Sequence, residues 1–319
     1  SKKLAESGNP IGMRMLCFLE MNGAGGAQKA PEQGFSWCEK AAEAGLGDAM
    51  RAVGGEYERG GQVTKNADKA EQWYDRAATA GNWAAMVELG RLMRGRNDKP
   101  QDIAAGTHWW QRAADLGSAR AQALLGASYV DGLHLSKDVP RGLRLLETAG
   151  TAGDDAALYA LGLLYQQGVV LEKNDALAAK FFLDSALRGN VEAMTAFALF
   201  SLHGVGVPQN DTDAFRWFNA AADGGHARGA YLVGWAYAVG RGTAKNQEQA
   251  LKWYRLGAER NSPEAMYALG GLEENGIEGK KNVAAAMDWY AKAAGLGHVD
   301  AMLTLGYCYD RGLHVSKDV

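Results

Sequence analysis

The chain has 319 residues, 47% of them hydrophobic and 22% charged, and its 34 basic and 37 acidic residues give a net charge of −3. This near balance, without a long basic run, argues against nucleic acid or an anionic membrane surface as the main partner. No apolar run reaches the length of a membrane-spanning helix, so the sequence predicts no transmembrane segment.

Two positions recur along the chain at a fixed spacing of 36 residues. The first position of an aromatic pair recurs at Trp37, Trp73, Trp109, Leu145, Phe181, Trp217, Trp253 and Trp289. A glycine within a helical pattern recurs at Gly54, Gly90, Gly126, Gly162, Gly234, Gly270 and Gly306, with Ala198 in its place once. Repeats of this length without insertions indicate a solenoid of stacked antiparallel helix pairs.

In chain order, residues 1–10 read as the tail of a second helix, and eight complete helix pairs follow. The predicted pairs cover residues 11–46, 47–82, 83–118, 119–154, 155–190, 191–226, 227–262 and 263–298. Residues 299–319 supply one more first helix and a loop. Because the register is unbroken, we expect one domain over residues 1–319.

An amide or acid ends each loop before a second helix, at Asn66, Asp102, Asp138, Asn174, Asn210, Asn246, Asn282 and Asp318. Side-chain oxygens of Asn and Asp accept hydrogen bonds from free backbone N–H groups at helix starts, so these residues are predicted N-caps. The helix glycines each cost about 1 kcal/mol relative to alanine, and a close approach of the paired helices is the expected compensation.

The pattern A-x-x-x-L-G-x-x-Y-x-x-G, a loop ending in Lys-Asn or Lys-Asp, and then A-x-x-W-Y-x-x-A-A-x-x-G resembles the Sel-1-like repeat family. This family is related to the tetratricopeptide repeat, and the resemblance covers essentially the whole chain. It implies an all-α fold, a right-handed α/α superhelical solenoid of 36-residue helix pairs. The motif residues build the scaffold and do not select a function.

Cys17 and Cys38 are both expected to be buried in the first repeat, where a disulfide or two free thiols are open alternatives. Free buried thiols are the favoured interpretation, although the resemblance implies that some family members carry such a disulfide. Both ends of the chain are expected to be cut within a repeat, with a targeting segment missing. The resemblance implies a periplasmic or exported bacterial protein.

No arrangement of residues predicts catalysis, a metal site or a cofactor. The histidines recur with the scaffold, as His226 and His298 do at a separation of two repeats, and no Cys/His ligand spacing occurs. No nucleophile, base and acid come together at any recognisable spacing. The Trp series is assigned to the core.

The resemblance implies that first helices line a concave surface, with exposed positions at fixed offsets from the helix glycine. These offsets predict a partner-binding set of Tyr159, Arg228, Tyr231, Trp235, Tyr267 and Tyr307, flanked by Arg91 and Arg94. Tyr231 and Trp235 share one helical face, and Tyr267 follows Tyr231 by one repeat, so a contiguous aromatic patch is expected. Trp235 either adds packing between first helices or anchors a partner, as exposed aromatic residues often do.

The leading hypothesis is a non-enzymatic scaffold that holds a protein partner on its concave face. By resemblance, one form of this role is a periplasmic immunity protein that neutralises a type VI secretion lipase effector. The alternative is a glycan- or peptidoglycan-binding envelope protein that uses Tyr231, Trp235 and Tyr267 as a stacking platform, with Glu264, Glu274 and Asn275 as hydrogen-bonding groups. A hydrolase is the third and least supported class.

Overall fold

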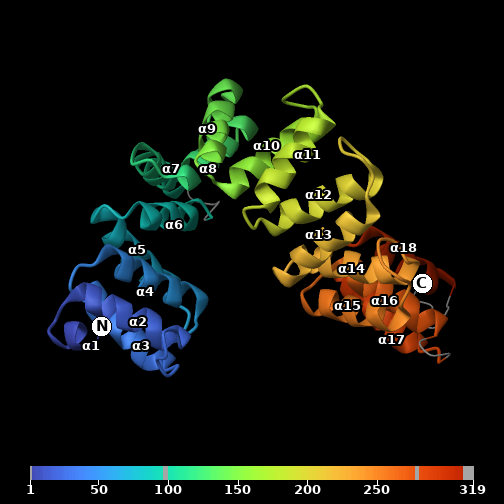
Figure 1. Ribbon diagram of the computed structural model, residues 1–319, viewed down its shortest axis with the longest axis horizontal. Helices are drawn as coiled ribbons and strands as arrows, with labels where there is room; N and C mark the ends of the chain where they lie inside the picture. The colour runs from blue at the N-terminus through green and yellow to red at the C-terminus, as the bar shows by residue number, and fades with distance from the viewer. Residues whose placement is uncertain (1, 96–99, 277–279, 312–319) are drawn as a thin grey trace. The chain divides into compact units, whose positions relative to one another are not determined.

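The computed structural model describes residues 2–95, 100–276 and 280–311, and every regular element in these ranges is a helix. The chain forms two compact units, residues 1–157 and 158–319. Within each unit, consecutive helices form pairs that follow one another along the chain (Figure 1). The predicted all-α repeat of helix pairs is therefore confirmed, and a single domain over 1–319 stays a prediction.

The helix bounds agree with the predicted repeats. The first unit holds α1 (Lys2–Glu6), α2 (Pro10–Asn22), α3 (Pro31–Glu43), α4 (Gly47–Arg59), α5 (Ala67–Thr79), α6 (Trp83–Arg94), α7 (Pro100–Asp115), α8 (Ala119–Asp131) and α9 (Val139–Thr151). The division between the units falls within α10 (Asp155–Gln167). The second unit continues with α11 (Asp175–Ala186), α12 (Val191–His203), α13 (Asp211–Asp223), α14 (Ala227–Val239), α15 (Gln247–Glu259), α16 (Pro263–Asn275), α17 (Val283–Gly295) and α18 (Val299–Arg311). The loop predicted after α18 lies outside the described residues.

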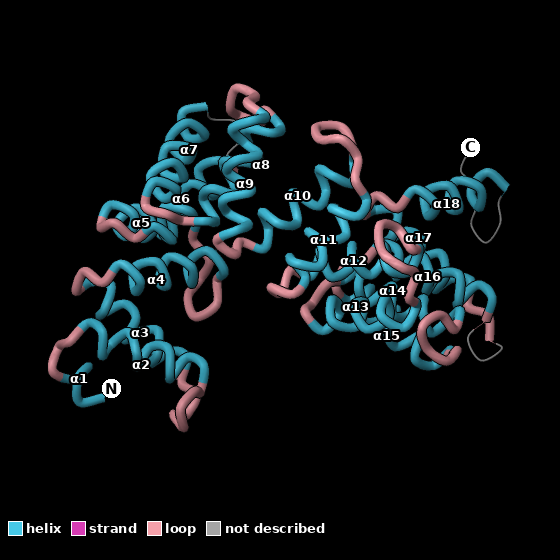
Figure 2. Tube along the Cα trace, turned by 45° about the horizontal axis from the view of Figure 1, so that its top comes forward, coloured by secondary structure: helices cyan, strands magenta, loops and turns pink. Residues whose placement is uncertain are grey.

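Short capped loops join the helices (Figure 2). The side-chain oxygens of Asn66, Asp138, Asn174, Asn210, Asn246 and Asn282 each accept from the N–H three residues on, at 2.9–3.1 Å. Asp102 is an exception, because α7 already begins at Pro100 and places Asp102 in its first turn. Asp318 lies outside the described residues. First helices such as α4 and α14 end at Gly60 and Gly240, whose φ of 78° favours glycine.

The helix glycines mark close crossings between the two helices of a pair. A Cβ atom there would lie 2.4 Å from the Trp110 ring at Gly90, 2.6 Å from the Phe182 ring at Gly162 and 2.4 Å from the Tyr290 ring at Gly270. No real Cβ atom tolerates such distances. The close approach expected from the glycines is therefore present, and the contacting ring is the second residue of each aromatic pair.

The Trp series lies at the edge of the core and not within it. Trp37, Trp73, Trp109, Trp217, Trp253 and Trp289 are all half-buried, whereas the residues that follow them are buried. Cations three residues on cover four of these rings, with centroid distances of 4.4 Å for Lys40, 4.2 Å for Arg76, 4.7 Å for Arg112 and 4.4 Å for Lys292. The assignment of the Trp series to the core is corrected: the second position of each aromatic pair supplies the core.

First helices of neighbouring repeats also touch each other. Contacts link α4 with α6 in the first unit, and α12 with α14 and α14 with α16 in the second. The first helices therefore form a continuous surface within each unit, here called the first-helix face. None of the described helices combines the length and apolar character that crossing a membrane requires.

A disulfide joins the first helix pair. Cys17 on α2 and Cys38 on α3 are bonded, with a Cα–Cα distance of 5.2 Å, and both are almost fully buried. The favoured interpretation of two free thiols is therefore wrong, because the two side chains meet across the α2–α3 interface. Cys308 is a free, buried thiol on α18.

Replacement of Gly162 by leucine should destabilise the protein. The new Cβ would lie 2.6 Å from the Phe182 ring, and overpacking of this kind typically costs about 1–3 kcal/mol. The gain in helix propensity offsets only about 1 kcal/mol of that cost. Gly271→Leu is the matched control, because its Cβ would meet nothing closer than the Tyr290 hydroxyl at 3.8 Å. Thermal denaturation should show a lowered midpoint for Gly162→Leu alone, and equal shifts in both variants would contradict a close crossing at Gly162.

The disulfide predicts the thiol count of the protein. Unfolded without reductant, the chain should present one titratable thiol, Cys308, and three after reduction. A cross-link across this sequence separation of 21 residues contributes on the order of 3 kcal/mol in the chain-entropy view, so reductant should also lower the unfolding midpoint. A count of three thiols in unfolded protein that has not been treated with reductant would show that the bond is absent.

Candidate protein-binding surface

Three tyrosines on the first-helix face of the second unit occupy one repeat position. Tyr159, Tyr231 and Tyr267 each pack on the ring 23 residues later in the chain. The ring centroids are 5.7 Å apart for Tyr159 with Phe182, 5.9 Å for Tyr231 with Tyr254 and 5.4 Å for Tyr267 with Tyr290. All three tyrosines are half-buried, so each ring is held by one contact with the core and keeps part of its surface exposed.

Trp235 lies one turn beyond Tyr231 on α14 and is also half-buried. It packs against two groups of buried residues, one from α12, α13 and α14 and one from α15 to α18. Tyr231 and Tyr267 pack against the second of these groups as well. Tyr231, Trp235 and Tyr267 thus all pack against one group of buried residues, and Trp235 contacts both groups while part of its ring stays exposed.

A pocket of about 260 Å³ opens on the same face across three first helices. Its polar walls come from Tyr159 and Gln166 on α10, Glu192 on α12, and His226 with Arg228 at the start of α14. Burial raises the pKa of Tyr159 and lowers the pKa of His226. The pocket therefore holds one positive and one negative side chain beside a histidine whose neutral form is favoured by burial.

A hydrogen bond and an ion pair hold two pocket side chains in place. The Nδ1 atom of His226 lies 2.7 Å from the buried Thr195 hydroxyl oxygen. The Nε atom of Arg228 lies 3.5 Å from Glu264, on the next first helix, while its side chain remains 54% exposed. Arg228 thus lies between the pocket and the aromatic patch and is accessible to a partner.

Glu192 and His226 are pocket residues that the sequence-based prediction missed. His226 was assigned to the scaffold because it recurs as His298 two repeats on. The sequence did contain a signal for His226, because histidine replaces a common capping residue there. The same position precedes a first helix in other repeats and carries the N-caps Asn82, Ser118, Asn190 and Ser262. His298 still accepts from the Ala301 N–H at 3.2 Å, whereas His226 makes no such cap and pairs with Thr195 instead. Within the described residues, no group of His, Cys, Asp and Glu could hold a metal.

Tyr307 occupies the repeat position of Trp235 on α18 and is 58% exposed. The Arg311 guanidinium lies 5.7 Å from its ring centroid. Its predicted exposure on the first-helix face is therefore met.

The two arginines predicted to flank the site differ from each other in the first unit. Arg91 has a 49% exposed side chain that pairs with Glu58 and, at 2.9 Å, with Glu88. Although burial alone would raise it, the pKa of Glu58 is lowered by hydrogen bonds from Arg91 and Tyr74. Arg91 is thus accessible, but its charge is largely balanced within the protein.

Arg94 is buried, with only 8% of the residue exposed, so its predicted place on the partner-binding face is wrong. Its guanidinium donates to the Thr107 hydroxyl, to the Ser128 hydroxyl at 3.1 Å and to the Leu133 carbonyl at 3.5 Å. It also lies 4.4 Å from the Trp110 ring centroid. Burial lowers the pKa of Arg94, whose role is to join α6 to α7 and α8.

Comparisons with known proteins agree with this architecture. The family model described as Sel1 repeat matches residues 10–46, 47–82, 83–118, 119–154, 155–190, 191–226, 227–262, 263–298 and 299–319. A protective antigen of uropathogenic Escherichia coli with this repeat fold is 30% identical, with a TM-score of 0.60, and the match covers 97% of this chain and 66% of that one. A Sel1 repeat protein from Oxalobacter formigenes is 24% identical, with a TM-score of 0.58 and coverage of 99% and 81%. No curated protein matches the chain.

Arg94 and Arg91 should respond differently to replacement by alanine. Loss of Arg94 removes three hydrogen bonds and a ring contact from a buried site, which should cost about 2 kcal/mol of unfolding free energy. Loss of the half-exposed Arg91 pairs should cost less than about 1 kcal/mol. Denaturant unfolding of both variants measures the difference, and equal stability of the two would argue against a structural role for Arg94.

Proposed function

Because the chain belongs to the Sel1 repeat family, whose scaffold is a protein-interaction fold, we propose that it is a non-enzymatic scaffold that binds a protein partner. The partner would occupy the first-helix face of the second unit, with Trp235, Tyr231 and Tyr267 as its anchor. The observation that carries this proposal is the aromatic patch, in which three half-exposed rings pack around one buried cluster.

The residue types, packing and partial exposure of these rings favour protein binding. Tyrosine, tryptophan and arginine dominate the energetics of protein interfaces, and all three types occur here beside the pocket. Tyr231 and Tyr267 are already held against core rings, so binding would cost little side-chain entropy. Arg228 adds an accessible charge at the edge of the patch. The outer Trp series is less suited to this role, because cations already cover four of its rings.

The glycan-binding alternative has less support. A glycan needs free hydrogen-bonding groups next to the rings that it stacks on, yet the groups expected to serve already have partners. Glu264 accepts from Ser262 and pairs with Arg228, Glu274 accepts from the Tyr290 hydroxyl, and Asn275 donates to the Gly271 carbonyl. One side of the Tyr267 ring is also occupied by His298, at a centroid distance of 4.7 Å. We therefore favour a protein partner.

We also propose that the protein works in the periplasm or outside the cell. The buried Cys17–Cys38 disulfide supports this location, because such bonds persist in oxidising compartments. An immunity protein against a secreted type VI lipase effector is the specific form of the proposal that follows from the family resemblance. The nature of the partner tests this form: a lipase would support it, and an envelope protein would replace it by an adaptor role.

Replacement of Trp235 by alanine should weaken partner binding by about thirtyfold or more. An aromatic anchor typically contributes at least about 2 kcal/mol, and each 1.4 kcal/mol is a factor of ten. A photo-crosslinking residue at the exposed Tyr307 position would first identify the partner, whose Kd would then be measured by calorimetry. Lys252→Ala is the control, since Lys252 is an exposed residue of second helix α15 in a simple pair with Glu248.

The control variant should bind as tightly as the wild type. If Trp235→Ala keeps both its melting temperature and its affinity, the partner does not use the aromatic patch. Crosslinks from a photo-reactive residue at position 252 instead of 307 would point to the outer helices.

A further inference from the structure

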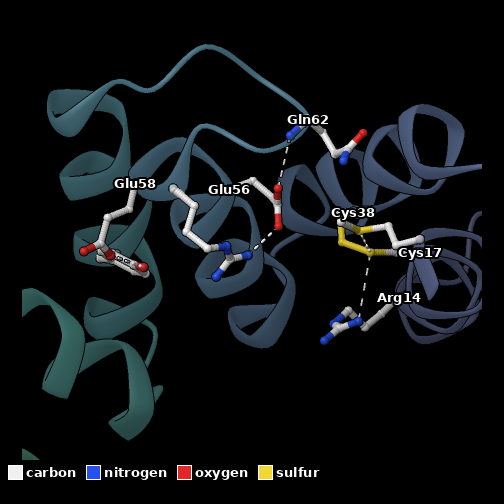
Figure 3. A network of polar contacts seen from close by, with 9 residues as sticks. Arg14, Cys17, Cys38, Glu56, Glu58 and Gln62 are labelled. Carbon is white, nitrogen blue, oxygen red and sulfur yellow. Dashed lines mark hydrogen bonds and ion pairs between the residues drawn. A yellow bond between two sulfur atoms is a disulfide. The ribbon is translucent and has the colours of Figure 1, made fainter. Parts of the chain in front are cut away.

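A second, larger pocket lies on the first-helix face of the first unit and has no role in the function proposed above. Its volume is about 750 Å³, and α2, α4 and α6 supply most of its walls. Charged residues dominate it, with Arg14, Arg51, Arg59, Lys65 and Arg91 facing Glu56, Glu58 and Glu88. Figure 3 shows Arg14, the disulfide, Glu56 and Glu58 from the walls of this pocket.

Two repeat positions that carry aromatic rings on α14 carry none in this pocket. Arg51 and Gly55 on α4 stand in register with Tyr231 and Trp235 on α14, five repeats later. At these two positions α14 carries aromatic rings, whereas α4 carries a flexible cation and a glycine without a side chain. A Cβ at Gly55 would have its nearest neighbours at 3.3 Å and 3.5 Å, the Arg59 Nη1 atom and the Tyr74 hydroxyl.

Arg14 is a second departure from the repeat. Its position carries methionine in five later repeats, at Met50, Met86, Met194, Met266 and Met302, and Gln122, Leu158 or Ala230 in the others. In the first repeat the guanidinium replaces this apolar side chain, and its Nη1 atom lies 4.0 Å from the Cys17 sulfur (Figure 3). A positive charge thus stands at the wall of the pocket where the repeat requires none.

The charges of the pocket do not balance. All three glutamates are engaged: Glu56 pairs with Arg59 and accepts from the Gln62 N–H, while Glu58 and Glu88 pair with Arg91. Within the described part of the chain, no carboxylate lies within ion-pair distance of Arg14, Arg51 or Lys65. The Nε atom of Arg51 is buried and has no hydrogen-bond partner there. A buried donor without a partner is costly, so the pocket lacks an acceptor.

We infer that this pocket binds carboxylate groups of an acidic polypeptide segment, with Arg51 and Arg14 as the principal ligands. Guanidinium groups bind carboxylates with charge-assisted, often bidentate hydrogen bonds. The three glutamates disfavour a dianionic group such as phosphate more than a singly charged carboxylate. The exposed Phe18 and the Met21 side chain provide apolar contact for the segment. The volume lies within the range of ordinary ligand pockets.

The direct test is binding of a fluorescent hexaglutamate peptide, blocked at both ends, to the full chain at low salt. Arg51→Gln and Arg14→Gln should each weaken binding by about tenfold or more, because each removes a charged hydrogen-bond donor. The control Arg144→Gln makes the same change of charge on the exposed outer helix α9 and should leave the affinity within about twofold of wild type.

Gly55→Leu tests the pocket itself without a change of charge. Leu163 and Leu199 stand at the same repeat position, and the atom nearest to a Cβ at Gly55 is the end of the flexible Arg59 side chain, which can shift by a few tenths of an ångström, so the variant should fold and block the pocket. Peptide binding should fall by about tenfold or more, with an unchanged or higher melting temperature. If this variant does not fold, the two arginine variants decide the outcome.

Two further binding measurements distinguish side-chain carboxylates from a C-terminal carboxylate and from phosphate. A hexaglutamine peptide with a free C-terminus tests for a terminal carboxylate, and stronger binding than hexaglutamate would assign the pocket to chain ends. Inorganic phosphate that displaces the peptide at lower concentration than acetate would overturn the carboxylate assignment. Equal binding to wild type, Arg51→Gln and Gly55→Leu would overturn the pocket. Trp235→Ala should bind the peptide normally, so this test fails or succeeds independently of the aromatic patch.

Discussion

The contact between a helix glycine and the second residue of the next aromatic pair determines the geometry of most repeats. At Gly90, Gly162 and Gly270 a methyl group would lie within 2.4–2.6 Å of a ring, so in these pairs the absence of a side chain allows the two helices to cross this closely. This crossing recurs at a spacing of 36 residues in most pairs, although Gly126 meets Leu146 and Ala198 replaces the glycine once, and it keeps the helix pairs in register. Residues at equivalent positions of successive first helices therefore line up as a column along the first-helix face of each unit. The residue type at each place in a column determines the chemistry of the local surface.

The first helix pair lacks this contact and is joined differently. Phe18 occupies the glycine position and is 54% exposed, and Cys38 occupies the position of the packed ring. The disulfide from Cys38 to Cys17 links α2 to α3 at the place where later repeats pack a ring on a glycine. A covalent bond thus replaces the packing contact in this helix pair.

The repeat columns explain how one scaffold carries two different surfaces. The column that holds Tyr159, Tyr231 and Tyr267 in the second unit holds Arg51, Val87 and Ala123 in the first. The column of Trp235 holds Gly55, Arg91 and Ala127 there. Aromatic residues at these positions form the aromatic patch in the second unit, whereas Arg51 and Gly55 line the charged pocket in the first. The two surfaces differ in chemistry without any change in backbone architecture, so the proposed binding roles depend on a few substitutions at permissive positions.

The amino-acid sequence by itself determined the repeat length, the helix pairs, most N-caps and the glycine crossings, because these depend on spacing and on local backbone chemistry. It also placed Tyr231, Trp235 and Tyr267 on one face. Only the tertiary structure decided that Arg94 is buried among Thr107 and Ser128, that Arg91 is paired and that Cys17 bonds to Cys38. Long or reactive side chains reach partners in other helices, and a 36-residue period specifies their starting points but not which neighbour they contact.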